Sequence, residues 1–396
     1  MEFHFALIIV GGLFVIGLVT DAIGRYTALP RVTLLILLGV VVGPAGFDVL
    51  PVQLRDWFEF LASVALAMVA FLLGGSLSRN QLHRHGRQIL IVSVVVVAST
   101  VAIVGGGLVV LGVAPISALL LSGIATATAP AATMDVIKEA GAKGVFAQTL
   151  KGIVAIDDAW GLIVFSVLLA AANALMGNGV HSVLQQGLWE LFGAIAIGAA
   201  IGFPAAFLSG RLRAGEPMQT EALAIVFLCA GISIWLEVSF LLAGIVSGMV
   251  VANFAKHHTR PFHEIENIER PFMILFFFLA GASLHADRWL ELGLIVGACI
   301  VLRIISRIVG GWLGGKLSGS PEYFNRWIGM ALMPQAGVAI GMALVAGNHF
   351  PDLRETILTI TIVTTIAFEI FGPLATRISL KKAPHRNRRT PRVEGP

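Results

Sequence analysis

The sequence predicts an all-α membrane protein with about 13 transmembrane helices. Its 396 residues are 57% hydrophobic and only 13% charged, and the mean hydropathy is +0.89. A water-soluble globular protein cannot bury so much apolar surface, so most of the chain is expected to lie in the bilayer. The 44 glycines favour a helical bundle, because small residues let membrane helices approach closely. The sequence lacks the alternating pattern of a β-barrel.

Apolar runs near the ~20 residues that a helix needs to cross the hydrocarbon follow one another along the chain. The first run has no basic flank, and further apolar runs follow it, which indicates a spanning helix and not a cleaved signal. The predicted spans are residues 5–22, 31–46, 57–77, 88–111, 115–138, 146–173, 183–209, 219–236, 239–254, 268–285, 290–315, 324–347 and 353–378. No soluble domain fits between them.

The positions of Lys and Arg predict the orientation, because cytoplasmic loops retain these residues. If the C-terminus is cytoplasmic, most of the 27 basic residues fall on that side, and the outer loops hold Arg55, Arg288 and Arg354. An odd number of spans then places the N-terminus outside a multi-pass protein of the cell (inner) membrane. Residues 379–396 form a basic tail, for which a lipid-facing strip is favoured over a nucleic-acid module.

Two adjacent carboxylates, Asp157 and Asp158, lie in the sixth span, 11 and 12 residues beyond Phe146. That depth is about 17 Å at 1.5 Å per residue, close to the bilayer midplane. An ionisable group there is costly unless it is paired or lines a pathway. Such a carboxylate can bind either a proton or Na⁺, and an exchanger needs that competition. In the alternative interpretation, hydrogen bonds or basic partners satisfy both aspartates, which only lock helices together.

Arg303 and Arg307 share one face of the eleventh span, since they are four residues apart. A guanidinium group does not deprotonate, so each is a fixed charge that must meet a carboxylate or water. Consecutive helical residues point about 100° apart, so one aspartate can pair with an arginine while the other faces an ion path. A purely structural pairing of the two arginines with the two aspartates is equally open.

The fifth span contains Thr126, Thr128 and Pro130 in a run of small residues near its centre. Pro130 removes a backbone donor and clashes with the preceding turn, so the helix should break there. The freed carbonyls must find partners or line a cavity, and together with the threonine hydroxyls they are hard oxygen ligands for Na⁺. A kinked helix without a binding role is the alternative.

The twelfth span contains a similar proline-based interruption around Pro334 and Gln335. It follows the fifth span by seven, and an odd offset means the opposite direction. Two interrupted helices in corresponding, antiparallel positions are typical of inverted-repeat transporters with ion sites at the midplane. Spans one to six would correspond to spans eight to thirteen, with the seventh as a linker.

These residues carry a resemblance to a known family. The runs Asp-Asp-Ala-Trp-Gly at 157–161, Thr-Ala-Thr-Ala-Pro-Ala-Ala-Thr at 126–133 and Arg-Ile-Val-Gly-Gly at 307–311 resemble the monovalent cation:proton antiporter superfamily. The likeness covers nearly the whole chain, and the double aspartate resembles the sodium/proton exchanger branch.

The resemblance implies the sodium/proton antiporter fold, a homodimer in which a scaffold holds a mobile core. Asp158 matches the ion- and proton-binding carboxylate, Asp157 matches the carboxylate that pairs with a basic residue, and Arg307, not Arg303, matches that basic residue. Thr126 and Thr128 match the crossing region. The implied parts are residues 1–80 (dimerisation and scaffold), 87–173 (core), 183–209 (linker helix), 215–288 (scaffold), 290–378 (core) and 379–396 (cytoplasmic tail).

Two departures from the family pattern bear on stoichiometry. Many relatives carry Asp where this chain has Ala129, and electrogenic members have Lys where it has Arg307. A lysine can release its proton during the cycle and an arginine does not, so the double aspartate alone does not establish two protons per Na⁺. Glu369, in the last span, is expected to be a structural hydrogen-bond acceptor.

The predicted function is exchange of H⁺ for Na⁺ or Li⁺ by alternating access, with proton and cation competing at Asp158 and Asp157, and with neither cofactor nor enzymatic activity. One alternative is a K⁺/H⁺ exchanger or efflux protein of the same superfamily, although such proteins commonly append a cytosolic nucleotide-binding domain. Another is a sodium-coupled symporter of organic solutes with similar architecture. An intramembrane aspartyl protease is disfavoured, because its two carboxylates must converge from different helices.

Overall fold

The computed structural model describes residues 3–26, 31–48, 52–76, 79–142, 144–176, 180–208, 218–255, 260–283, 289–335 and 337–383. Within these ranges the secondary structure is helical, and no strand occurs. The basic tail from residue 384 lies outside the described residues.

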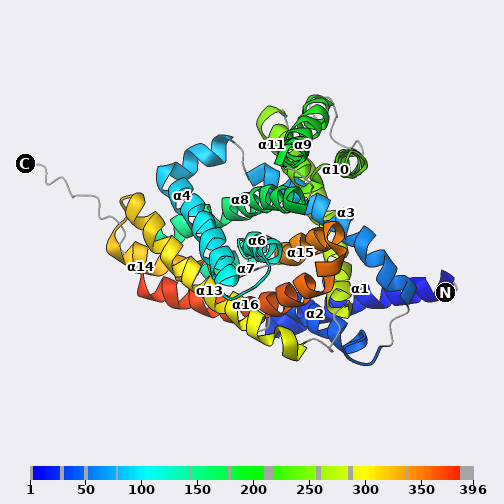
Figure 1. Ribbon diagram of the computed structural model, residues 1–396, viewed down its shortest axis with the longest axis horizontal. Helices are drawn as coiled ribbons and strands as arrows, with labels where there is room; N and C mark the ends of the chain where they lie inside the picture. Colours follow the sequence, from blue (N-terminus) through cyan, green and yellow to red (C-terminus); the bar gives the residue numbers. More distant parts are fainter. Residues whose placement is uncertain are drawn as a thin grey trace, which may run out of the picture.

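The helices follow one another as the apolar runs predict (Figure 1). The first nine are α1 (Phe3–Tyr26), α2 (Arg31–Val42), α3 (Val52–Ser76), α4 (Arg79–Thr100), α5 (Gly106–Val110), α6 (Pro115–Ile124), α7 (Pro130–Glu139), α8 (Val145–Met176) and α9 (Val180–Leu208). A π-helical turn, η1 (Val101–Gly105), joins α4 to α5. The others are α10 (Met218–Trp235), α11 (Phe240–Phe254), α12 (Arg260–Ala282), α13 (Trp289–Leu317), α14 (Glu322–Ala331), α15 (Val338–His349), the 3₁₀ turn η3 (Pro351–Leu353) and α16 (Arg354–Lys382).

These helices confirm the predicted all-α fold with about 13 spans. Five described helical stretches are long and apolar enough to cross a membrane by length and composition alone: Gly86–Val110, Val145–Asn173, Leu188–Leu208, Leu292–Leu317 and Pro351–Lys382. Shorter apolar helices coincide with most of the other predicted spans. Two helices begin well before their predicted spans. The helix α4 begins at Arg79 and not near residue 88, with a non-helical residue, Gly86, between its two parts. The helix α12 begins at Arg260 and not near residue 268, because polar and apolar residues alternate at helical spacing over its first turns.

The two predicted interruptions are confirmed. The fifth span divides into α6 and α7, and Pro130 is the first residue of α7, where its missing N–H costs no hydrogen bond. The twelfth span divides into α14 and α15, with Pro334 inside the break. Each break leaves backbone carbonyls at the end of a half-helix without intrahelical partners.

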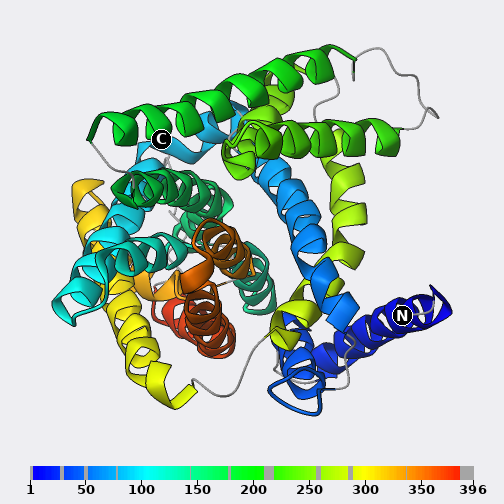
Figure 2. The same ribbon diagram turned by 45° about the vertical axis from the view of Figure 1, so that its right-hand side comes forward.

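The helices form two groups around these breaks. In the first, α13 packs along α4 and α14, α8 packs on α4 and α6, and α16 packs on α14 and α15. In the second, α11 packs along α3, and α12 packs along α2 and α3. The helix α9 lies against α11 and α8. Figure 2 shows the cyan, orange and red helices of the first group gathered together, with the blue and yellow-green helices of the second group beside them.

Two glycines permit the close contacts that position the polar centre of the first group. A Cβ atom on Gly329 of α14 would lie 2.1 Å from the carbonyl oxygen of Arg307, so α14 can rest directly on α13 at that arginine. A Cβ atom on Gly161 of α8 would lie 3.0 Å from the hydroxyl oxygen of Thr126. The first interrupted helix therefore lies against α8 one turn beyond the two aspartates.

Candidate functional site

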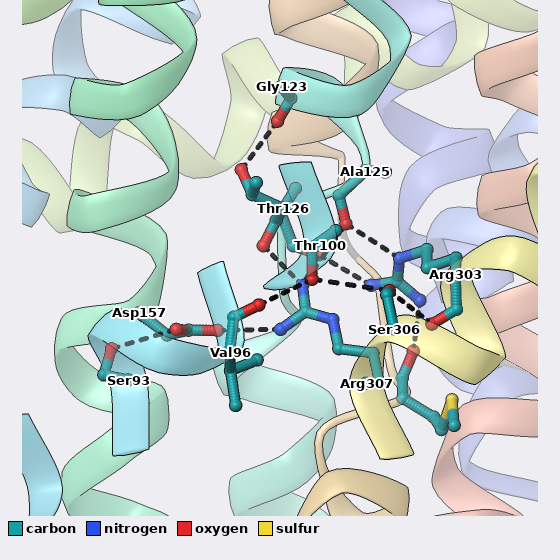
Figure 3. A network of polar contacts seen from close by, with 12 residues as sticks. Ser93, Val96, Thr100, Gly123, Ala125, Thr126, Asp157, Arg303, Ser306 and Arg307 are labelled. Carbon is teal, nitrogen blue, oxygen red and sulfur yellow. Dashed lines mark hydrogen bonds and ion pairs between the residues drawn. The ribbon is translucent and has the colours of Figure 1, made fainter. Parts of the chain in front are cut away.

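A buried ion pair joins α8 to α13 at the centre of the first group (Figure 3). The Nη1 atom of Arg307 lies 3.1 Å from Oδ2 of Asp157, and both side chains have 0% exposure. The hydroxyl of Ser93, on α4, donates to the other carboxylate oxygen, Oδ1, at 3.0 Å. Both oxygens of Asp157 are therefore engaged, which agrees with the predicted pairing of Asp157 with Arg307.

The second amino group of Arg307 caps the first interrupted helix. Its Nη2 atom lies 3.3 Å from the carbonyl oxygen of Ala125, 3.2 Å from that of Ala127 and within hydrogen-bond distance of that of Thr126. These carbonyls follow the C-terminal end of α6, where the helix dipole places partial negative charge. A guanidinium group is a suitable cap, because its donors diverge from one planar charge.

Arg303 connects the first break to the second. Its Nε and Nη2 atoms donate to the carbonyl oxygens of Ala125 and Ala127 at 3.0 and 2.7 Å, and its Nη1 atom donates to that of Met333 at 2.8 Å. The guanidinium carbon lies 4.2 Å from the centroid of the Phe368 ring, which covers one face of the cation. One side chain thus joins the ends of α6 and α14 and contacts α16.

The threonines of the first break are buried, as expected for a crossing in the membrane. Thr126 and Thr128 are 0% and 1% exposed. The hydroxyl of Thr126 donates to the carbonyl oxygen of Gly123 at 2.6 Å, so its oxygen keeps lone pairs for another partner. The carbonyls of residues 125–127 accept hydrogen bonds from the two arginines in this conformation, and their role as cation ligands stays a prediction.

The second break contributes Gln335, whose side chain is 1% exposed. Its Oε1 atom has no hydrogen-bond partner among the described residues, and the same is true of the hydroxyl of Thr361, on α16. Both residues line a cavity of about 20 Å³ together with Arg303 and Ala125. That volume is enough for one water molecule, for which these polar atoms are suitable partners.

Asp158 follows Asp157 in α8, and its side chain lies outside the described residues. The positive and negative charges of the described groups around Asp157 nearly balance without the charge of Asp158. Two guanidinium groups face the carboxylate of Asp157 and the ends of two half-helices, each of which carries roughly half a negative charge.

Sequence reasoning missed three contributors to this centre. Ser93 gives only a weak signal, a lone hydroxyl in an apolar run. The carbonyl of Met333 and the ring of Phe368 give no signal at all, because any residue has a carbonyl and any core has aromatic rings. The contact of Arg303 with both breaks was equally hidden, although the spacing of the two arginines correctly predicted a shared face.

The chain is similar to known transporters over nearly its full length. The model of the family described as sodium/hydrogen exchanger, transmembrane, matches residues 9–382. The ammonium/H⁺ antiporter subunit AmhT of Alkalihalophilus pseudofirmus is 20% identical over 375 residues, 92% of this chain and 93% of that protein. The Na⁺/H⁺ antiporter NhaP of Pseudomonas aeruginosa is 24% identical over 288 residues, 66% of each chain.

The fold is also that of a solved structure. The sodium proton antiporter MjNhaP1 from Methanocaldococcus jannaschii, determined at pH 8, superposes with a TM-score of 0.76 at 17% identity. The superposition covers 97% of this chain and 99% of the other.

Proposed function

Because the chain belongs to the sodium/hydrogen exchanger family and its activity is therefore cation/proton antiport, we propose that it exchanges H⁺ for Na⁺ or Li⁺ at Asp158. The pairing of Asp157 with Arg307 is the observation that carries this assignment. It gives one aspartate a permanent counter-charge and leaves the other for the transported ions. The name of the Pseudomonas relative favours Na⁺, whereas that of the Alkalihalophilus relative makes ammonium the competing substrate.

Exchange follows from competition for one carboxylate. When Asp158 is ionised it binds the cation, and when a proton binds, the negative charge that held the cation is gone. Arg307 keeps its charge throughout, so it stabilises Asp157 and carries no proton. The site thus alternates between a cation-loaded and a protonated form, both electrically compensated in a medium where an uncompensated charge is costly.

Thr126 and Thr128 are proposed to complete the cation site with hydroxyl oxygens. Gly161, which lies against the Thr126 hydroxyl, is three residues after Asp158 and so on the same side of α8. We therefore expect the backbone of Asp158 to lie near Thr126, where α8 meets the first interrupted helix. Oxygen donors of this kind suit Na⁺ and Li⁺, which are hard cations.

We propose that the two helix groups are the moving parts of alternating access. The core would be residues 87–173 and 290–378, the scaffold residues 1–80 and 215–288, and the linker residues 183–209. The separate packing of α13, α4 and α8 on one side and of α12, α3 and α11 on the other supports this division. A homodimer through the scaffold, with the N-terminus outside and the C-terminus in the cytoplasm, completes the proposal.

Proton flux in proteoliposomes tests this function. Purified protein is reconstituted with an internal pH dye, and Na⁺, Li⁺, K⁺ or NH₄⁺ is added outside. We expect Na⁺ and Li⁺ to drive proton movement, Asp158→Asn to abolish it, and Asp352→Asn, an exposed carboxylate in η3, to leave it unchanged. Exchange at the wild-type rate in Asp158→Asn would reject Asp158 as the binding site. Proton movement in response to NH₄⁺ or K⁺ alone would reject Na⁺ and Li⁺ as the transported cations. Stimulation by an organic solute favours the symporter alternative.

A further inference from the structure

A buried hydrogen bond links two residues that are far apart in the sequence, Thr33 of α2 and Glu369 of α16. The hydroxyl of Thr33 donates to Oε2 of Glu369 at 2.5 Å. The side chains are 0% and 5% exposed, so water does not compete for this hydrogen bond. Breaking it without a replacement partner is costly for both groups.

This bond crosses from one helix group to the other. The helix α2 packs mainly along α12, within the proposed scaffold, whereas α16 packs mainly against α14 and α15, within the proposed core. The direct contact between α2 and α16 is small. If the core moves against the scaffold during exchange, the Thr33–Glu369 bond is one that the movement must break.

The position of the bond on α2 makes it strong. Thr33 lies in the first turn of α2, which begins at Arg31. First-turn amides have no intrahelical partner, and the helix dipole favours an acidic group there. Glu369, on a core helix, therefore places its carboxylate at the N-terminal end of a scaffold helix, in surroundings that strengthen the hydrogen bond from the Thr33 hydroxyl.

The inverted repeat supplies a counterpart of this contact. The hydroxyl of Ser239, the N-cap residue of α11, donates to the hydroxyl of Ser166 on α8 at 3.1 Å. When spans one to six are matched with eight to thirteen, α2 corresponds to α11 and α8 to α16. Because those matched spans run in opposite directions, the two bonds between the groups lie toward opposite faces of the membrane.

We propose that the Thr33–Glu369 hydrogen bond is a latch between core and scaffold that holds the described conformation and is released in each exchange cycle. Glu369 is then a positioning residue, separate from the cation site at Asp158. This inference rests on the proposed alternating access and adds the contact that opposes the movement. It goes beyond the sequence expectation, in which Glu369 is only a structural acceptor.

Reversible cross-linking tests whether the contact must open. Thr33 and Glu369 are both replaced by cysteine in a background with Cys229→Ala and Cys299→Ala, which removes the two buried free thiols. A short, reducible bifunctional thiol reagent joins them, because it accepts a wider range of Cα separations than a direct disulfide does. The matched control joins cysteines at Gln88 and Ser320, whose side chains are hydrogen-bonded at 2.7 Å within the proposed core.

We expect Na⁺-driven proton flux in the unlinked protein, a loss of at least tenfold after linking Thr33→Cys to Glu369→Cys, and recovery on reduction. The Gln88/Ser320 link should leave flux within twofold of the unlinked value. Undiminished flux in the linked protein overturns the latch, as does failure of the pair to link where the control pair links. Absence of flux in the cysteine-free parent would contradict the proposed exchange itself. That outcome differs from failure of the latch, in which the parent exchanges and the link has no effect.

Single variants keep the latch testable if the cysteine pair misfolds. Thr33→Val removes the hydroxyl and keeps the shape, whereas Thr33→Ser keeps the hydroxyl. The loss of one buried hydrogen bond shifts the ratio of two conformers about fivefold. We therefore expect turnover to differ at least threefold between Thr33→Val and wild type, with Thr33→Ser close to wild type, when all three are assayed at a temperature at which each remains folded. Equal turnover in Thr33→Val and Thr33→Ser overturns the proposal.

Discussion

Arg303 of α13 donates a hydrogen bond to the carbonyl oxygen of Met333, 2.8 Å away in the second interrupted helix. The same guanidinium group holds two carbonyls of the first interrupted helix. The negative ends of both half-helices therefore converge on one fixed cation, which explains how two breaks can persist inside a membrane, where free carbonyls are not tolerated.

Removing Arg303 should destabilise the protein strongly. In Arg303→Ala, carbonyls of both breaks lose their donor, and we expect a loss of about 3–5 kcal/mol in the free energy of unfolding. Arg303→Lys keeps the charge but not the forked geometry, so its free energy of unfolding should lie between those of the wild type and Arg303→Ala. Thermal unfolding in detergent measures this, with Arg326→Ala, an exposed arginine, as the matched control. Equal melting temperatures for Arg303→Ala and Arg326→Ala contradict the bridging role.

The ion pair of Asp157 with Arg307 should respond unequally to loss of either partner. Arg307→Ala leaves a buried carboxylate and three carbonyls with fewer donors, so it should lower thermal stability more than Asp157→Asn, which keeps an acceptor for Arg307. A double-mutant cycle should give a coupling of about 1–3 kcal/mol. Equal, negligible shifts in the two single variants would count against the pairing.

Exchange should be electroneutral, with one proton for each monovalent cation. Arg307 cannot release a proton and Asp157 stays paired with it, so one carboxylate handles both ions in turn. We expect proton flux driven by Na⁺ to be the same at zero and at imposed inside-negative potentials. Marked acceleration by the potential would show that a second proton is carried and that Asp157 titrates during the cycle.

Thr126→Val should weaken cation binding without stopping turnover. If the hydroxyl oxygen is a cation ligand, its loss should raise the KM for Na⁺ about tenfold while kcat changes less. Thr126→Ser, which keeps the oxygen, should restore KM, and it is the control for packing against Gly161. An unchanged KM in Thr126→Val removes this threonine from the cation site. A similar fall in stability of both variants would assign Thr126 to helix packing.

Much of the fold could be predicted because the bilayer imposes a simple rule. An apolar run of about 20 residues must become a helix, so the spans and their number follow from hydropathy alone. The break at Pro130 also follows, because proline cannot continue the hydrogen-bond ladder. The start of α12 was missed, since its first turns are amphipathic and hydropathy gives no signal for a helix there.

The candidate site was predictable in its charges and not in its contacts. Charged residues are rare at this depth, so Asp157, Asp158, Arg303 and Arg307 stood out in the sequence. The choice of Arg307 as the partner of Asp157 came from the family resemblance, and the 3.1 Å contact agrees with it. Neither source indicated that Arg303 spans both breaks or that Thr33 meets Glu369.

The sequence by itself determined the helical spans, the two interruptions and the set of charges that the membrane must compensate, because each depends on residue type and local spacing. Only the tertiary structure decided which groups compensate which charges. Ser93, the carbonyl of Met333 and Glu369 acquire their partners from segments far away in the chain, and the energy of a buried polar group is set by the atoms within hydrogen-bond distance and not by its neighbours in sequence.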